Sequence, residues 1–339
     1  MPRVDVKMRT AAWRELSRND VGFLNKLSDV FVKLETRNPE AIPNLRAAEC
    51  LFIGSDYGGE HSGAKYDTFA FLMADIAECA AWQNIRKQIR SDKRLGRRRM
   101  AFKNMNDTVR ARAFPDFFES ANGIHGILTV FAIHKRSGSL FGSGERLNPA
   151  TLDFEPLRTL SVPIGEKLIR VVSLLGLLIA GFSAPGQDVL WATDEDAIAA
   201  NACRVRHLVD ALAIVSSNLL NHDLRHLRVA TAEQDMGDLS LEDLLAIPDA
   251  AAGGLSDALS NMFAEGAPPV GFEFLPSSTA SAKAQRVLDW FADNTQPLRR
   301  MCVIIDQAPD TQKLRATHIR FRGLRDIFHV VKARPSMRE

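Results

Sequence analysis

The feature that most constrains the fold is a nearly unbroken apolar run at 126–134, with the sequence Gly-Ile-Leu-Thr-Val-Phe-Ala-Ile-His. A strand with one solvated face alternates apolar and polar residues, whereas a strand covered on both faces is apolar almost throughout. The run therefore predicts a strand inside a sheet that is covered on both sides. Apolar runs at 50–55 and 188–193 predict two further strands, and an acidic residue follows each of them.

Segments with helical periodicity separate these strands. We expect helices in 10–47 (broken near Pro39 and Pro43), 75–92, 107–121, 154–183, 197–220, 241–263 and 284–294. Further strands are expected at 66–73, 227–231, 301–305 and 317–321. This pattern predicts an α/β fold in which helices flank a sheet.

The chain divides into four parts by composition. Residues 266–283 are rich in Pro, Ser, Gly and Ala, which predicts a linker. Before it we expect a helical N-terminal extension at 1–47 and a main domain at 48–265. After it we expect a small C-terminal αβ appendage at 284–339, whose two strands could instead add to the main sheet. A length of 339 residues suits one large domain with additions, or two domains.

Cysteine usage and hydropathy favour a cytoplasmic protein. The four cysteines are scattered without the spacing of a zinc or redox motif, and reduced thiols suit the cytosol. The longest apolar run, Val171–Phe182, is too short to span a bilayer. We therefore expect a buried core helix there and no membrane association.

Three aspartates lie at predicted strand ends or in a late helix. Asp56 ends the first strand, Asp194 follows the strand at 188–193, and Asp249 lies in the helical stretch 241–263. Mg²⁺ and Mn²⁺ take oxygen ligands, and two such ions can activate water and stabilise the leaving oxygen in phosphodiester cleavage. The set therefore predicts a metal site. Each acid by itself also fits a capping or turn-forming role.

Short motifs around these aspartates resemble the RNase H-like enzymes. Val189–Asp194 is similar to their fourth strand, an apolar strand that ends in Thr-Asp. Phe52–Gly59 resembles their first strand, which ends in an Asp and is followed by a turn and a second, antiparallel strand. Asp249–Leu255 resembles the late helix that carries their last acid. The resemblance covers residues 48–262 and implies an RNase H-like mixed sheet flanked by helices.

The chain more closely resembles a large uncharacterised prokaryotic family of RNase H-like proteins. Members of that family open with an Asp-Glu-Ser-Gly-type motif and end with a Leu-Gln-Leu-Ala-Asp-Leu-x-Ala-Gly-type helix, which 241–254 resembles. Two positions depart from the pattern: Tyr57 follows Asp56 where the family has Glu, and Pro248 precedes Asp249. Glu60 is the nearest acid after Asp56, and 60–63 restores the Glu-x-Ser-Gly part of the motif.

The sharpest charge feature is the segment 87–112, in which only Asp92 and Asp107 oppose ten basic residues. These are Lys87, Arg90, Lys93, Arg94, Arg97, Arg98, Arg99, Lys103, Arg110 and Arg112. Arg and Lys contacts to phosphates supply most of the sequence-independent affinity for nucleic acids. The net charge of the whole chain is only +2, so this argument depends on the local cluster. A solvated helix face or a docking surface for an acidic protein would give the same pattern.

Together these features predict a metal-dependent nuclease that uses Mg²⁺ or Mn²⁺. The expected metal ligands are Asp56, Asp194 and Asp249. Glu60 is the fourth catalytic candidate, and Glu195 or Asp196 would replace a ligand if the strand end shifts. The residues expected to hold nucleic acid, whether DNA or RNA, are Arg97, Arg98, Arg99 and Lys103.

The departure at Tyr57 and the N-terminal extension leave a second hypothesis open. The chain would then be a catalytically inactive RNase H-like subunit or adaptor in a larger protein–nucleic acid assembly. In that case the helical extension would dock a protein partner or a second copy of the chain.

Overall fold

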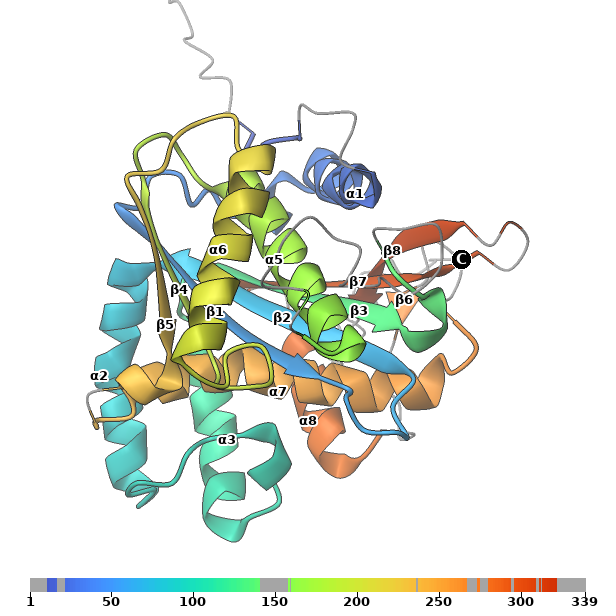
Figure 1. The fold of residues 1–339 in the computed structure, drawn as a ribbon. Helices are drawn as coiled ribbons and strands as arrows, with labels where there is room; N and C mark the ends of the chain where they lie inside the picture. Colours follow the sequence, from blue (N-terminus) through green and yellow to red (C-terminus); the bar gives the residue numbers. More distant parts are fainter. Residues whose placement is uncertain are drawn as a thin grey trace, which may run out of the picture.

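A mixed β-sheet with helices on both faces forms the centre of the computed structural model (Figure 1). The structure describes residues 11–16, 22–140, 158, 160–235, 237–266, 273–274, 280–293, 296–308, 311 and 313–321. The strands in this part of the chain are β1 (Cys50–Gly58), β2 (Tyr66–Asp75), β3 (Gly126–His134), β4 (Asp188–Thr193), β5 (His226–Thr231), β6 (Glu273–Phe274), β7 (Leu298–Gln307) and β8 (Leu314–Phe321).

The strand order is β5-β4-β1-β2-β3-β7-β8-β6. Strand β2 runs antiparallel to both β1 and β3, while β4 and β5 run parallel to β1. On the other side, β7 is parallel to β3 and β8 is antiparallel to β7. Every residue of β3 is buried, which confirms that this apolar run is a strand covered on both faces.

Two groups of helices cover the two faces of the sheet. The long helices are α1 (Phe23–Arg37), α2 (Ile76–Asp92), α3 (Thr108–Ala121), α5 (Val162–Phe182), α6 (Ala202–Leu219), α7 (Ser240–Met262) and α8 (Ala282–Ala292). Helices α1, α5 and α6 share one hydrophobic core with the sheet, and α2, α3, α7 and α8 share the other (Figure 1).

Side chains along β1 alternate between these two cores. Leu51 and Ile53 lie in the core that contains α5, whereas Phe52 lies in the core that contains α7. The alternation follows from the two-residue period of a strand. It directs even-numbered positions, including Asp56, toward α7, and odd-numbered positions, including Tyr57, toward α5.

The N-terminal part of the chain differs from the expected helical extension. Residues 11–16 are not helical, and the helix begins only at Phe23. Trp13 is 3% exposed and stacks on Phe31 of α1, with ring centroids 4.0 Å apart. Burying these aromatic rings stabilises the fold, so this segment belongs to the main core and its apolar face is not free for docking.

The C-terminal strands add to the main sheet and do not form a separate appendage. Strand β7 pairs with β3 over eight residue positions, from Gly126 opposite Leu298 to Ile133 opposite Ile305. Because β3 is apolar on both faces, a neighbouring buried strand completes its backbone hydrogen bonds without exposing apolar surface. The two residues of β6, which lie in the predicted linker, pair with β8.

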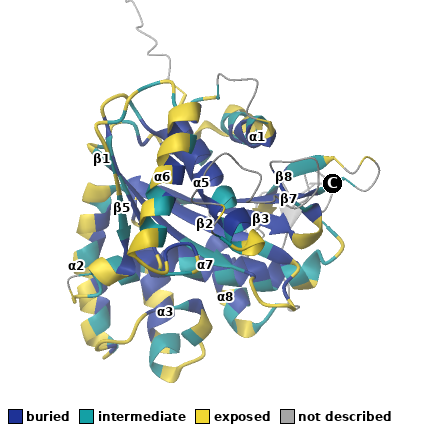
Figure 2. Ribbon diagram, viewed as in Figure 1, coloured by how far each residue is buried: buried dark blue, intermediate teal, exposed yellow. Residues whose placement is uncertain are grey.

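The apolar run Val171–Phe182 lies in α5, where all of its residues are buried against the sheet (Figure 2). This confirms the expected core helix. Within the described part of the chain, no helix combines the length and apolar character needed to cross a bilayer.

Candidate carboxylate site

The pairing of β1 with β4 places Asp56 beside Asp194. These parallel strands are in register from Cys50 opposite Asp188 to Ser55 opposite Thr193. Asp56 and Asp194 are the residues that directly follow this last pair on the two chains. The alternation along β1 places the Asp56 carboxylate on the α7 side, and Asp194 is near enough to act on the ionisation of both Asp56 and Asp249.

Helix α7 brings Asp249 to the same place. A Cβ added to Gly54 would lie 3.5 Å from the Leu245 side chain, and one added to Gly58 would lie 3.0 Å from the backbone of Ala252. Asp56 lies midway between these two glycines and therefore faces the middle of the helical stretch, where Asp249 lies. The close approach depends on the absence of side chains at both glycines. Helix α7 runs through Pro248 without a break.

The electrostatics of the site support this convergence. Burial raises the pKa of Asp56 well above its usual value, the nearby Asp249 raises it further, and Asp194 and Asp196 act in the same direction. Burial also raises the pKa of Asp249 to about 6, and Asp194 again acts in the same direction. Carboxylates that share a partly desolvated site resist simultaneous ionisation.

The raised pKa of Asp249 predicts a pH-dependent stability difference between the wild type and Asp249→Asn. The folded pKa of about 6 exceeds the ordinary 3.8, so the carboxyl group contributes stability below about pH 4 and loses it as the pH rises through 6. Asn keeps an acceptor oxygen but carries no charge. We expect Asp249→Asn to be the more stable protein above pH 6 and the advantage to vanish near pH 4.

Urea denaturation of both proteins across this pH range measures the effect. Asp210→Asn is the matched control, because Asp210 is exposed on α6 and should show no such crossover. A variant at position 249 that is less stable than the wild type at pH 8 would contradict the prediction.

The chemistry of these three carboxylates fits a hard divalent cation. Oxygen ligands are what Mg²⁺ and Mn²⁺ prefer, and a cation would relieve the mutual repulsion of the buried pair. In the structure, however, two of these carboxylates accept hydrogen bonds from backbone N–H groups. Asp56 Oδ1 accepts a hydrogen bond from the Tyr57 N–H at 2.5 Å, and Asp249 Oδ2 accepts one from the Phe102 N–H at 2.5 Å. As they stand, no three His, Cys, Asp or Glu side chains among the described residues are placed to hold a metal ion.

Glu60 is held by a lysine. The Lys167 ammonium of α5 forms an ion pair with Glu60 and a second one with Asp196, at 2.6 Å. Its Nζ also lies 4.8 Å from the centroid of the Tyr57 ring. Burial by itself would lower the pKa of Lys167, but its carboxylate partners Asp196 and Glu60 raise it overall. Lys167 therefore stays charged and ties the β1–β2 loop to the loop after β4.

Tyr57 fills the position on β1 that follows Asp56 and faces the opposite core. Its hydroxyl lies 2.9 Å from Ser55 Oγ and 3.3 Å from Thr193 Oγ1, and the Trp191 indole N–H donates to Ser55 Oγ at 2.8 Å. This buried network joins β1 to β4 directly beneath the carboxylates. Burial raises the pKa of the Tyr57 hydroxyl, so it stays protonated.

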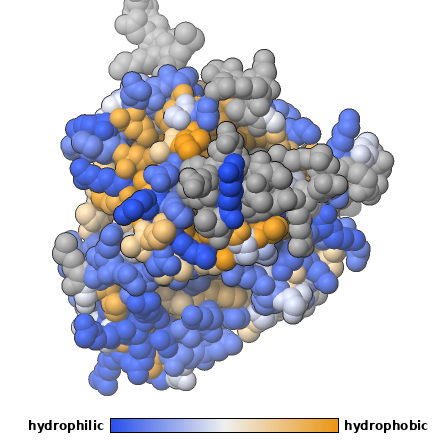
Figure 3. Space-filling model, viewed as in Figure 1, coloured by the Kyte–Doolittle hydropathy of each residue, from blue (hydrophilic) through white to orange (hydrophobic). Residues whose placement is uncertain are grey.

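The predicted nucleic-acid residues lie in the loop between α2 and α3 and in the short helix η2 (Phe102–Asn104). All four side chains are exposed. Arg99 pairs with Glu242 of α7 at 2.6 Å, whereas no ion pair of Arg97, Arg98 or Lys103 occurs within the described part of the chain. The part of the visible surface formed by α2 and α3 is strongly hydrophilic (Figure 3).

Other basic residues of the segment 87–112 are structural. Arg90 pairs with the buried Asp243 at 2.8 Å and donates to the backbone oxygens of Gly96 and Arg98 at 3.0 and 2.9 Å. Lys93 pairs with Asp116 at 2.5 Å. The segment therefore combines these structural contacts with a larger set of exposed cations, which are Lys87, Arg94, Arg97, Arg98, Arg99, Lys103 and Arg112.

Phe102 fixes the loop against α7 beside Asp249. Its ring packs on Gly253, where an added Cβ would lie 2.3 Å from the ring, and its N–H donates to Asp249. The neighbouring Lys103 acts to lower the pKa of Asp249, as does Lys283 of α8. The sequence does not identify Lys167, Lys283 or the Phe102 amide as parts of the site, because each comes from a segment distant from the aspartates.

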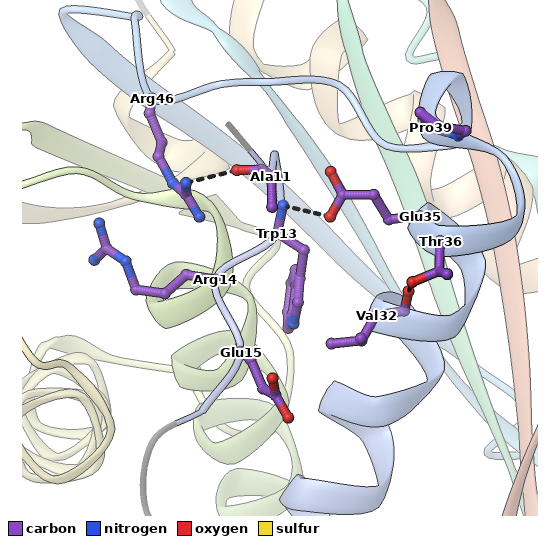
Figure 4. A pocket seen from close by; sticks show the side chains of 9 residues that line it. All are labelled: Ala11, Trp13, Arg14, Glu15, Val32, Glu35, Thr36, Pro39 and Arg46. Carbon is purple, nitrogen blue, oxygen red and sulfur yellow. Dashed lines mark hydrogen bonds between the residues drawn. The ribbon is translucent and has the colours of Figure 1, made fainter. Parts of the chain in front are cut away.

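A separate cavity of about 580 Å³ lies between residues 11–16 and α1 (Figure 4). Two of its charged lining residues already bind the backbone of the fold. Glu35 accepts hydrogen bonds from the N–H groups of Ala12 and Trp13, and Arg46 donates to the backbone oxygens of Ala11 and Gly181. These contacts fasten the N-terminal segment, and the predicted aspartates do not line the cavity.

No family model matches the sequence, and no curated protein matches it.

Proposed function

We propose that this protein is a metal-dependent nuclease of RNase H-like fold that hydrolyses phosphodiester bonds in nucleic acid. The observation that carries the proposal is that Asp56, Asp194 and Asp249 come together at the carboxyl ends of the parallel strands β1 and β4, beside helix α7.

The arrangement of the first five strands supports the fold part of the proposal. The resemblance of 48–262 to RNase H-like enzymes implies a mixed sheet flanked by helices, with a second strand antiparallel to the first; in the strand order β5-β4-β1-β2-β3, β2 is antiparallel to β1 and β3, while β4 and β5 are parallel to β1. The additional strands β7 and β8 extend this sheet at the β3 side.

The chemistry follows from the donor set. Asp56, Asp249 and Asp194 would hold Mg²⁺ or Mn²⁺, which would supply positive charge at the phosphate and lower the pKa of a bound water. Asp56 and Asp249 would turn an oxygen from a backbone amide toward the ion. The exposed Arg97, Arg98 and Lys103 would bind phosphates of the substrate beside the site.

Calorimetric titration with Mn²⁺ tests the proposal. At pH 7.5 Asp249 is mainly ionised, because that pH lies above its pKa of about 6. We expect the wild type to bind the ion and Asp56→Asn and Asp194→Asn both to lose binding. Asp223→Asn is the matched control. Asp223 precedes the amino end of β5, whereas the proposed site lies at the carboxyl ends of the parallel strands, so this variant should leave binding intact.

A second function is favoured by two observations. As they stand, no three His, Cys, Asp or Glu side chains among the described residues are placed to hold a metal ion, and Glu60 is held by Lys167. An RNase H-like module that binds nucleic acid or a protein partner without cleavage would have these properties. Absence of Mn²⁺ binding by the wild type, with and without nucleic acid, would favour this inactive module over the nuclease.

A further inference from the structure

Lys283 lies next to the carboxylate site although it belongs to a distant part of the chain. It lies in the first turn of α8, which packs on α7 so closely that a Cβ added to Gly254 would lie 2.6 Å from Val287. Its ammonium is 4.1 Å from the centroid of the Phe102 ring. This cation–π contact places the ammonium against the residue whose backbone N–H donates to Asp249.

Phe102 connects Lys283 to the site. The ring packs on Gly253, and the backbone N–H of the same residue donates to Asp249 Oδ2 at 2.5 Å. Lys103 follows directly in the chain. The ammonium of Lys283 therefore lies over the ring of the same residue whose backbone N–H donates to Asp249.

Within the described part of the chain, Lys283 forms no ion pair with an acidic side chain. The lysine is partly exposed. A phosphate entering the site would meet three carboxylates, which repel it, unless cations stand beside them. Lys103 and Lys283 are placed to offset that repulsion at Asp249.

We propose that Lys283 contacts a backbone phosphate of the nucleic-acid substrate, so that the strand lies between the loop 94–104 and the start of α8. This inference rests on the proposed function and names a contact that the basic segment 87–112 does not contain. Lys283 is then a positioning residue that holds the substrate over Asp249.

Nucleic-acid binding without cleavage tests the contact. Fluorescently labelled single-stranded DNA, single-stranded RNA and duplex DNA are titrated with the whole 339-residue chain in EDTA, and the anisotropy is followed as the salt concentration rises from about 50 to about 200 mM. Loss of one phosphate contact lowers the slope of log K against log salt by about 0.7 for single strands and about 0.9 for duplex DNA. We expect this decrease for Lys283→Gln.

Two further variants separate charge from structure. Lys283→Arg keeps the charge and the contact with the Phe102 ring, and should keep the wild-type slope. Lys313→Gln removes an exposed lysine between β7 and β8 and should also leave the slope unchanged. A wild-type slope in Lys283→Gln, with wild-type binding intact, would overturn this inference alone. Failure of the wild type to bind any of the three probes would overturn the proposed function and the inference together.

Discussion

Asp243→Ala is expected to destabilise the protein by about 3–5 kcal/mol, because it leaves a buried guanidinium without its main partner. The Asp243 and Arg86 side chains are each 1% exposed, and their ion pair measures 2.9 Å. Arg90, 10% exposed, pairs with the same carboxylate at 2.8 Å. Two arginines of α2 thus depend on one buried acid in the first turn of α7.

Urea denaturation at neutral pH measures this loss. Asp238→Asn is a matched control, because Asp238 pairs with the same Arg86 at 3.2 Å but is 45% exposed. An exposed pair contributes about 1 kcal/mol or less, so the control should unfold close to the wild type. Equal effects of the two variants would mean that water reaches Arg86 and would contradict the prediction.

The same variant should disturb the surface that we propose for nucleic acid. Arg90 holds the backbone oxygens of Gly96 and Arg98, and its own orientation depends on Asp243. Without the Asp243 carboxylate, Arg90 no longer fixes the backbone of the loop that carries Arg97 and Arg98. We therefore expect Asp243→Ala to weaken nucleic-acid binding even under conditions in which the protein remains folded.

Asp56→Asn is expected to lower the rate of nucleic-acid cleavage by about 1,000-fold or more. Stabilisation of phosphoryl charge by a bound metal ion contributes several kcal/mol, and each 1.4 kcal/mol corresponds to a factor of ten in rate. Asp56 is the central carboxylate of the proposed site, because Asp249, Asp194 and Asp196 all influence its ionisation. Single-turnover cleavage of labelled DNA and RNA with Mg²⁺ measures the effect.

Glu60→Gln provides the comparison for this experiment. Glu60 is paired with Lys167, and it is not among the carboxylates that influence Asp56 most strongly. We expect this variant to lose no more than about 10–100-fold in rate, the range of a residue that supports metal ligands without binding the ion. Cleavage by Asp56→Asn at a rate close to that of the wild type would place the reaction elsewhere and would remove the basis for the proposed site.

Much of the secondary structure could be predicted from local patterns. The strands at 126–134 and 188–193 have the expected bounds, and α2 and α3 begin directly after Asp75 and Asp107. Both of these aspartates accept hydrogen bonds from backbone N–H groups of the first turn, which is a signal that lies within a few residues. The N-terminal segment was predicted less well, because Trp13 is placed by its contact with Phe31 and not by a helical pattern.

By itself, the sequence determined that apolar strands alternate with helices and that aspartates follow two of the strands. Hydrophobic periodicity and the identity of the residue after a strand can both be seen within a short stretch of sequence. Only the tertiary structure decided what surrounds those aspartates. Phe102 reaches Asp249 because Gly253 leaves room for its ring, and Lys283 arrives there because α8 packs on α7. These contacts join residues far apart in the chain, and they depend on shape complementarity between helices, which no local pattern of residues encodes.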